Sequence, residues 1–229
     1  MAKGGRGVLY VATGAAHAEA ARASAASVRA TNPGLGVTLF TDQAVTGPEF
    51  DRVEPVASPH IRSKVDYLAE TPFAETLYLD TDTRVLGELS EVFRLLERFD
   101  LGLAQRAHVP ASPAKAAWRH AVPSAFPQAN SGVVLYRSSP ATLEFLAEWR
   151  AAYAEAGFKV DQITLRELLW ASDIRFAVLP ARFNTRRYTW LHHWFGSTPR
   201  PVILHTNRFH PTKFGPVRRW LDGLTGPYR

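Results

Sequence analysis

The stretch Thr76-Leu77-Tyr78-Leu79-Asp80-Thr81-Asp82-Thr83 is the most informative part of this sequence for the fold. Its apolar run predicts a buried strand, and the run ends in two carboxylates at positions i and i+2. Side chains at i and i+2 of a strand point to the same face. Where the strand gives way to a turn, both carboxylates can reach one divalent cation through oxygen ligands. The alternative is an ordinary surface turn that follows a strand.

The composition bounds the class of protein. The chain has 229 residues, 46% of them hydrophobic, which is enough to bury the core of one large domain. It has no cysteine, which excludes disulfides, thiolate catalysis and cysteine-based zinc sites, and favours an intracellular protein. No segment approaches the roughly 20 apolar residues of a membrane span. Residues 1–6 lead into a strand pattern without the apolar region of a signal peptide. We therefore expect a cytoplasmic location.

The net charge of +6 is unevenly distributed. Residues 175–229 hold ten of the 27 basic residues and one of the 21 acidic residues, and so carry +9. This excess fits a phosphorylated ligand, peripheral contact with an anionic membrane surface, or a solvated basic face. Nucleic acid is not the expected partner, because no helix-turn-helix, RNP or finger motif accompanies the charge.

Strand and helix patterns alternate along the chain. In the first half we expect a strand at 7–12, a helix at 15–30, a strand at 37–41, a helix at 61–70 and the strand before Asp80. The first three form a β-α-β unit, which implies parallel strands and a ligand crevice at their carboxyl ends. In the second half we expect helices at 89–99, 140–155 and 160–170, strands at 101–104, 131–136 and 202–204, and an irregular loop at 109–128. A loop of that length is often a lid or a binding loop.

Taken in order, the motifs of the chain resemble a known family. They are Ala12-Thr13-Gly14, Lys64, the Asp80-Thr81-Asp82 turn, Asn130-Ser131-Gly132-Val133, Asp161-Gln162, Phe183-Asn184 and Ile203-Leu204-His205. This order resembles the nucleotide-sugar glycosyltransferases of GT-A fold, especially those similar to family 8, over roughly residues 8–213. The resemblance implies an α/β, Rossmann-like, mixed and mostly parallel sheet flanked by helices. It also implies a single domain with a nucleotide-binding half near 7–105, a half near 106–229 that completes the acceptor and metal sites, and a basic C-terminal segment.

The same resemblance implies an activity. Such enzymes transfer a sugar from a nucleoside diphosphate donor, usually a UDP-sugar, to a small-molecule or glycan acceptor, with Mn²⁺ or Mg²⁺ bridging the diphosphate. A leaving diphosphate gains charge, so a divalent cation and basic side chains must stabilise it. By the resemblance, Asp80, Asp82 and His205 are the metal ligands. Carboxylate and imidazole together suit Mn²⁺ better than Ca²⁺. Taken alone, His205 is a histidine that ends a strand.

Further site residues are implied by the resemblance. Ala12 and Thr13 match the position that holds the base and ribose, Thr81 lies between the two acids, and Lys64 matches a basic residue near the donor. Lys64 is otherwise a lysine on a helix surface. Asn130 would bind the donor sugar, although a turn before a strand also explains it.

The pair Asp161-Gln162 matches the family's Asp-Gln pair, in which the acid contacts sugar hydroxyls and the amide lies near the anomeric carbon. As a local feature Asp161 is also typical of a helix N-terminus. Asn184 would be a lesser sugar or acceptor contact. The resemblance implies that the anomeric configuration is retained and that the leaving phosphate assists deprotonation of the acceptor. An inverting enzyme would need a base, for which Asp161 is the nearest candidate.

One departure from the family pattern concerns the diphosphate. The family follows its histidine with a glycine and a Lys-Pro-Trp run, which this chain lacks after His205. Arg208 or Lys213 would then take over the diphosphate contact.

Other classes of protein share parts of the pattern. A haloacid-dehalogenase-type phosphatase also has an apolar strand followed by Asp-x-Asp-x-Thr, but it needs further acids late in the chain, and none here are paired. A sugar nucleotidyltransferase needs a glycine-rich signature after the first strand, whereas Gly4-Gly5-Arg6-Gly7 precedes it. A non-catalytic basic binding module would make the acid pair incidental. The sequence does not fix the donor sugar, the acceptor or the oligomeric state.

Overall fold

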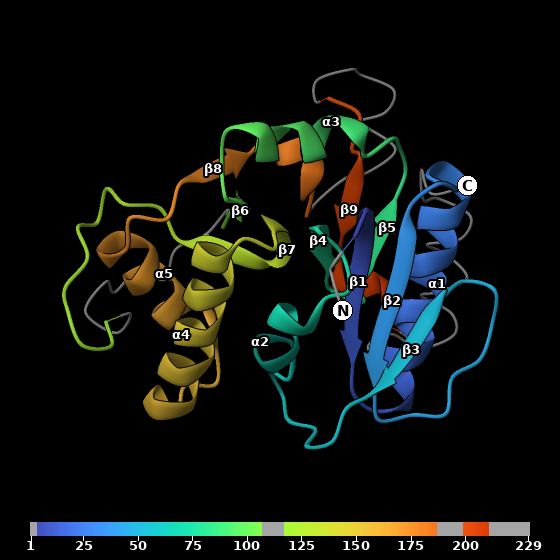
Figure 1. Cartoon of the computed structure of the whole chain (residues 1–229), viewed down its shortest axis with the longest axis horizontal. Helices are drawn as coiled ribbons and strands as arrows, with labels where there is room; N and C mark the ends of the chain where they lie inside the picture. The colour runs from blue at the N-terminus through green and yellow to red at the C-terminus, as the bar shows by residue number, and fades with distance from the viewer. Residues whose placement is uncertain (1–3, 107–116, 187–198, 211–229) are drawn as a thin grey trace.

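A central seven-stranded sheet organises the computed structural model, which describes residues 4–106, 117–186 and 199–210 (Figure 1). In spatial order its strands are β3 (Arg52–Pro55), β2 (Gly36–Thr41), β1 (Arg6–Ala12), β4 (Glu75–Leu79), β7 (Ala129–Arg137), β6 (Leu101–Gln105) and β8 (Phe176–Leu179). The pairs from β3 to β4 are parallel, β7 is antiparallel to both of its neighbours, and β6 and β8 are parallel. The sheet is therefore mixed and mostly parallel, which confirms the expected GT-A-like fold class.

Helices cover both faces of this sheet (Figure 1). The alanine-rich helix α1 (Ala15–Thr31) packs on one face, with Val8 and Tyr10 of β1 beneath it. The intervening Leu9 and Val11 point to the other face, because successive strand residues alternate. That face is covered by α2 (Lys64–Tyr67), α4 (Pro140–Ala156) and α5 (Gln162–Ala171). The unit β1–α1–β2 is the predicted parallel β-α-β unit.

A small second sheet determines the position of the late histidine. The strand β5 (Thr83–Val85) follows the acid turn and pairs antiparallel with β9 (Ile203–His205). Their register places His205 opposite Thr83. Segments more than 100 residues apart therefore meet directly beside Asp80 and Asp82.

Several sequence predictions of element type or extent are wrong. The helix expected at 61–70 is a turn followed by the four residues of α2 and a 3₁₀ turn η1 (Leu68–Glu70). The helix expected at 89–99 is α3 (Ser90–Phe93) and a 3₁₀ turn η2 (Arg94–Glu97). Strands β3, β5 and β8 have only three or four residues each and were not predicted. Such short strands carry too few residues for a periodic pattern to identify them.

The longer elements have clear local causes. Helix α4 begins where the Ser139 side chain accepts a hydrogen bond from Thr142 N–H, with Pro140 at its first position, and ends at Gly157 with φ 62°. In the predicted loop at 109–128, residues 117–128 contain no helix or strand, and the part before them lies outside the described residues. The basic segment after residue 210 also lies outside them. In the part of the chain that the structure describes, no helix has the length and apolar character needed to cross a bilayer.

Candidate functional site

A cleft of about 390 Å³ lies at the edge of the sheet where β1 and β4 end. We call it the carboxylate cleft. Among its lining residues are eight that the sequence predicted: Thr13, Lys64, Asp80, Thr81, Asp82, Asn130, Gln162 and His205. The antiparallel direction of β7 contributes to this convergence, because its first residues lie beside the end of β4. The backbone N–H of Asp80 donates to the Gly132 carbonyl at 2.8 Å.

Asp80, Asp82 and His205 form a group with the chemistry of a metal site. One ligand atom from each lies within 4.8 Å of the others. His205 Nε2 is 3.1 Å from Asp82 Oδ1 and 3.8 Å from Asp80 Oδ2. Two carboxylates held this close repel one another unless a cation lies between or beside them. Carboxylate oxygen and imidazole nitrogen are together suitable ligands for Mn²⁺ or Mg²⁺, and Mn²⁺ suits the nitrogen better.

The ring of His205 is oriented by Asn184. His205 Nδ1 lies 2.7 Å from Asn184 Oδ1, and an amide oxygen can only accept, so Nδ1 carries the proton. The lone pair of Nε2 is then directed at the two carboxylates, which is the orientation that a metal ligand needs. Arg186 Nη1 also donates to Nε2, at 2.8 Å. Asn184 is buried and does not line the cleft, so the structure places it behind the histidine.

Gly132 makes the close packing of this group feasible. A Cβ atom at this position would lie 2.3 Å from His205 Cε1 and 2.6 Å from Asp80 Oδ2. Any side chain would therefore displace two of the three candidate ligands. The N–H of Gly132 donates to Asn130 Oδ1 at 3.0 Å, which fixes the Asn130 side chain at the cleft.

Lys64 is buried, so it is not a lysine on a helix surface. Its Nζ donates to Asp80 Oδ1 at 3.1 Å, to the Ser131 carbonyl at 2.8 Å and to Ser131 Oγ at 3.0 Å. These three bonds account for the three donors of an ammonium group. Burial alone would lower the pKa of Lys64, but Asp161 and Asp80 outweigh it and raise that pKa above its ordinary value. Lys64 therefore remains charged and holds Asp80 in place.

Asp161 is fully buried and does not line the cleft. Its carboxylate lies 3.5 Å from Lys64 Nζ and 3.6 Å from Arg62 Nε. Burial alone would raise the pKa of Asp161, but Lys64, Ser131 and Arg62 outweigh it and lower that pKa, so the group is ionised. It occupies the N-cap position of α5, but its side chain makes no capping hydrogen bond. Its main electrostatic partner is Lys64.

Gln162 has a partner that the sequence did not reveal. Arg106, just after β6, donates from Nη1 to Gln162 Oε1 at 3.0 Å and lies 3.4 Å from Gln128 Oε1. With its oxygen bound by a guanidinium, the Gln162 amide has its N–H₂ group left to donate. The only sequence signal for Arg106 was its place after a strand at the same edge of the sheet.

Two further histidines, which the sequence analysis did not select, line the cleft. His17 Nδ1 is 3.2 Å from Thr81 Oγ1, and His17 Nε2 is 3.3 Å from His210 Nε2. Thr13 also lines the cleft, whereas Ala12 is buried and does not.

The two residues predicted to contact the diphosphate, Arg208 and Lys213, are not found in the cleft within the described part of the chain. Arg208 is exposed and does not line it, and Lys213 lies outside the described residues. The basic side chains that do line the cleft are Arg62, Lys64, Arg106 and Arg186. Two of them contact the metal-ligand group: Lys64 contacts Asp80 and Arg186 contacts His205. The cleft thus combines a cation site with positive charge suited to an anionic ligand.

Comparisons with known proteins agree with this geometry. The model of a family described as "Nucleotide-diphospho-sugar transferase" matches residues 74–214, more than half of the chain. No curated protein matches the chain.

Solved structures resemble the fold at low sequence identity. The galactosyltransferase LgtC, in complex with donor and acceptor sugar analogues, has a TM-score of 0.63 and 16% identity over 96% of each chain. Mouse xyloside xylosyltransferase 1 has a TM-score of 0.58 and 15% identity over 90% of this chain and 98% of that one. The glycosyltransferase GlyE of Streptococcus pneumoniae has a TM-score of 0.64 and 18% identity over 96% of this chain and 60% of that one.

Proposed function

The chain belongs to the nucleotide-diphospho-sugar transferase family and is a glycosyltransferase, and from this premise we propose its reaction and its machinery. It transfers a sugar from a nucleoside diphosphate sugar, UDP-linked as its similarity to family 8 suggests, to a hydroxyl of a small-molecule or glycan acceptor. Asp80, Asp82 and His205 hold the Mn²⁺ or Mg²⁺ ion that the transfer requires. A cytoplasmic location stays a prediction from the cysteine-free sequence.

The observation that carries this proposal is the convergence of the three ligand atoms within 4.8 Å. Asn184 supports it by fixing the tautomer of His205, and Lys64 supports it by holding Asp80. The hydroxyl of Tyr78 donates to Asp80 Oδ1 at 2.7 Å, and burial with the nearby Asp80 raises the pKa of Tyr78, so it stays a donor. The two oxygens of Asp80 therefore have different roles. Oδ1 accepts hydrogen bonds from the protein, and Oδ2 faces His205. When bound, the cation would stabilise the charge that develops on the leaving diphosphate.

The role of Arg186 follows from its contact with His205 Nε2. A nitrogen lone pair can serve a metal ion or an arginine N–H, but not both at once. We therefore expect the guanidinium to leave Nε2 when the cation binds and to contact the diphosphate beside it. Bidentate contact suits a guanidinium with phosphate oxygens. This assignment replaces neither Arg208 nor Lys213, which stay predicted contacts.

The donor sugar is assigned to Gln162 and Asn130, which both line the cleft. Arg106 occupies the Gln162 oxygen, so Gln162 acts as a hydrogen-bond donor to the sugar or to the leaving oxygen. Asp161 supports this arrangement from behind Lys64. Thr13, with Ala12 behind it, is assigned to the base and ribose of the donor, and Thr81 to the donor as well.

Retention of configuration is favoured by the shortage of a free carboxylate base. Among the described lining residues the carboxylates are Asp80 and Asp82, which are committed to the cation. Asp161 is buried and paired with Lys64. His60 uses both ring nitrogens within the protein, one with Asp66 and one with the N–H of Arg62. His17 and His210 also line the cleft, where their Nε2 atoms lie 3.3 Å apart. By the family resemblance, the leaving phosphate is the group that accepts the acceptor's proton.

The proposal is tested by release of UDP. Incubated with a panel of UDP-sugars and Mn²⁺, the wild-type protein should release UDP by slow hydrolysis, and faster when a suitable acceptor is added. EDTA should stop this release. The phosphatase alternative predicts instead rapid hydrolysis of p-nitrophenyl phosphate that is lost in Asp80→Asn. A non-catalytic binding module predicts no UDP release and no effect of metal.

A further inference from the structure

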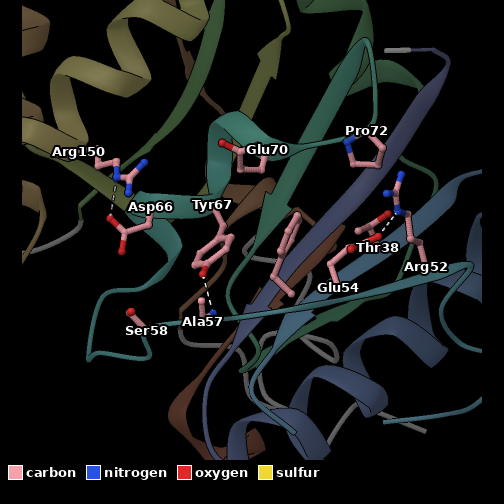
Figure 2. Close-up of a pocket in the computed structure, with 11 residues that line it drawn as sticks. Thr38, Arg52, Glu54, Ala57, Ser58, Asp66, Tyr67, Glu70, Pro72 and Arg150 are labelled. Carbon is pink, nitrogen blue, oxygen red and sulfur yellow. Dashed lines mark hydrogen bonds and ion pairs between the residues drawn. The ribbon is translucent and has the colours of Figure 1, made fainter. Parts of the chain in front are cut away.

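A second, larger cleft of about 480 Å³ lies between β2, β3, α2 and α4, and we call it the β2–β3 cleft. Its volume falls within the roughly 300–1,000 Å³ typical of small-molecule sites. Figure 2 shows Asp66, Tyr67, Glu70 and Arg150 on one side of it and Thr38, Arg52 and Glu54 on the other. The Asp80, Asp82 and His205 group does not line it.

The β2–β3 cleft arises where the helical layer fails to cover the sheet. The parallel register pairs Thr38 with Arg52 and Phe40 with Glu54, so these four side chains share one face. This is the face that α2 and α4 cover elsewhere. Over β3, the edge strand, polar side chains replace the apolar ones that a covering helix would need.

The wall of this cleft has one aromatic surface and two hydroxyl groups that can form further hydrogen bonds. The rings of Phe40 and Tyr67 are 5.0 Å apart between centroids, at 38°. Tyr67 Oη accepts the N–H of Ala57 at 3.0 Å, so its own proton is left to donate (Figure 2). Thr38 is 1% exposed, and its Oγ1 has no hydrogen-bond partner among the described residues. Leaving a buried hydroxyl without a partner costs stability, and a ligand hydroxyl that displaces the atoms now covering Thr38 would remove that cost.

The charges of the cleft are paired, which decides the kind of ligand. Arg52 pairs with Glu54, and Arg150 Nε lies 3.2 Å from Asp66 Oδ1 (Figure 2). Asp66 also binds His60 Nε2 at 2.6 Å. Among the eleven lining residues, therefore, each guanidinium already has a carboxylate. A phosphate or carboxylate ligand would have to compete with these acids and meet Glu70 as well, so an anion is disfavoured.

We propose that the β2–β3 cleft binds a neutral saccharide unit. A sugar ring has an apolar C–H face and a rim of hydroxyl groups that both donate and accept. The C–H face fits the half-buried ring of Tyr67, against which the buried ring of Phe40 packs. The sugar hydroxyl groups fit the carboxylate and guanidinium groups, the Tyr67 hydroxyl and the unpartnered Thr38 hydroxyl. This site is independent of metal and of the transfer reaction, because none of the candidate metal ligands takes part.

The test is saturation-transfer NMR followed by titration of the full-length protein. The probes are methyl glycosides of neutral hexoses and neutral disaccharides, with inorganic phosphate and glucuronate as anionic probes. At least one neutral saccharide should bind, the anions should not, and Asp82→Ala should bind it as well as wild type does. No neutral binder, preferential binding of the anions, or loss of binding in Asp82→Ala would each overturn the proposal.

Two substitutions locate the site. Thr38→Val and Glu54→Gln each preserve side-chain shape, and each should raise the saccharide Kd about fivefold or more, because one hydrogen bond is lost. Glu148→Gln, on the exposed side of α4 and outside the cleft, is the matched control and should bind as wild type. Thermal unfolding of every variant should match wild type within a few degrees. Unchanged affinity in both folded cleft variants would refute the location.

Discussion

The carboxylate cleft and the β2–β3 cleft share the helix α2, but they use charge in opposite ways. Lys64 of α2 lines the first, and Asp66 and Tyr67 line the second. In the carboxylate cleft two acids are held together beside an imidazole lone pair, an arrangement that a cation would complete. In the β2–β3 cleft each guanidinium is neutralised by a neighbouring carboxylate. The comparison shows that a cleft is suited to an ion when its charged groups are not neutralised by one another, whatever its volume.

The largest expected effect comes from Asp82→Ala. One lost ligand leaves the cation site incomplete, so metal-dependent UDP release should fall by about 100-fold or more. Because Asp82 also lies 3.1 Å from His205 Nε2, the fold of the variant without metal has to match wild type for this result to count. Calorimetric titration of Mn²⁺ and unfolding scans in EDTA check both statements. If Asp82→Ala weakened saccharide binding as much as it reduces UDP release, the two clefts would not be independent sites.

The next effect concerns the group behind His205. Asn184→Ala removes the acceptor that fixes the imidazole tautomer, and loss of such an outer partner typically costs about 10- to 100-fold in metal affinity. Asn184→Asp keeps an acceptor oxygen and is the matched control. Mn²⁺ affinity should order as wild type and Asn184→Asp above Asn184→Ala. Equal affinities in all three proteins would show that Asn184 does not orient the ring.

Arg106→Met should reduce turnover more than donor binding. The Gln162 amide loses the guanidinium that fixes its oxygen, so kcat for UDP release should fall about 10-fold, the size expected for one misoriented hydrogen-bonding group, while KM changes little. Arg106→Lys, which keeps a donor, should recover part of kcat. A rise in KM with constant kcat would instead assign Arg106 to donor binding.

The smallest effect is on stability and belongs to the β2–β3 cleft. Thr38→Val replaces an unpartnered buried hydroxyl with a methyl group of similar shape, so the free energy of unfolding should rise by about 0 to 1 kcal/mol. Urea unfolding without ligand measures this change. A loss of more than about 1 kcal/mol would mean that the hydroxyl has a partner in solution and is not available to a ligand.

Sequence reasoning succeeded where the pattern was local and long. The apolar runs of β1, β2, β4 and β7 and the capped helix α4 were predicted close to their observed bounds. The spacing of Asp80 and Asp82 likewise predicted two carboxylates on one turn. Strand β3 was missed because its four residues are mostly exposed, include two charged side chains and end in proline. Helices α2 and α3 were predicted too long, because each passes into a 3₁₀ turn after one helical turn.

The rest of the site depends on distant pairing that no local pattern encodes. His205 reaches Asp82 only through the register of β5 with β9, and the sequence indicates its role only through the family resemblance. The contact of Asn184 with His205 and that of Arg106 with Gln162 join residues 21 and 56 positions apart. Burial of Asp161 behind Lys64 is equally a product of tertiary packing.

The most direct test of the central claim is a titration of UDP into the wild-type protein and into Asp82→Ala, each with Mn²⁺ and with EDTA. The account predicts that UDP binds wild type with one Mn²⁺ per chain, counted by electron paramagnetic resonance of the bound ion. It also predicts that EDTA or Asp82→Ala removes both the bound Mn²⁺ and most of the UDP affinity. UDP binding of equal strength in Mn²⁺ and in EDTA would contradict the claim that these residues hold the cation that receives the donor.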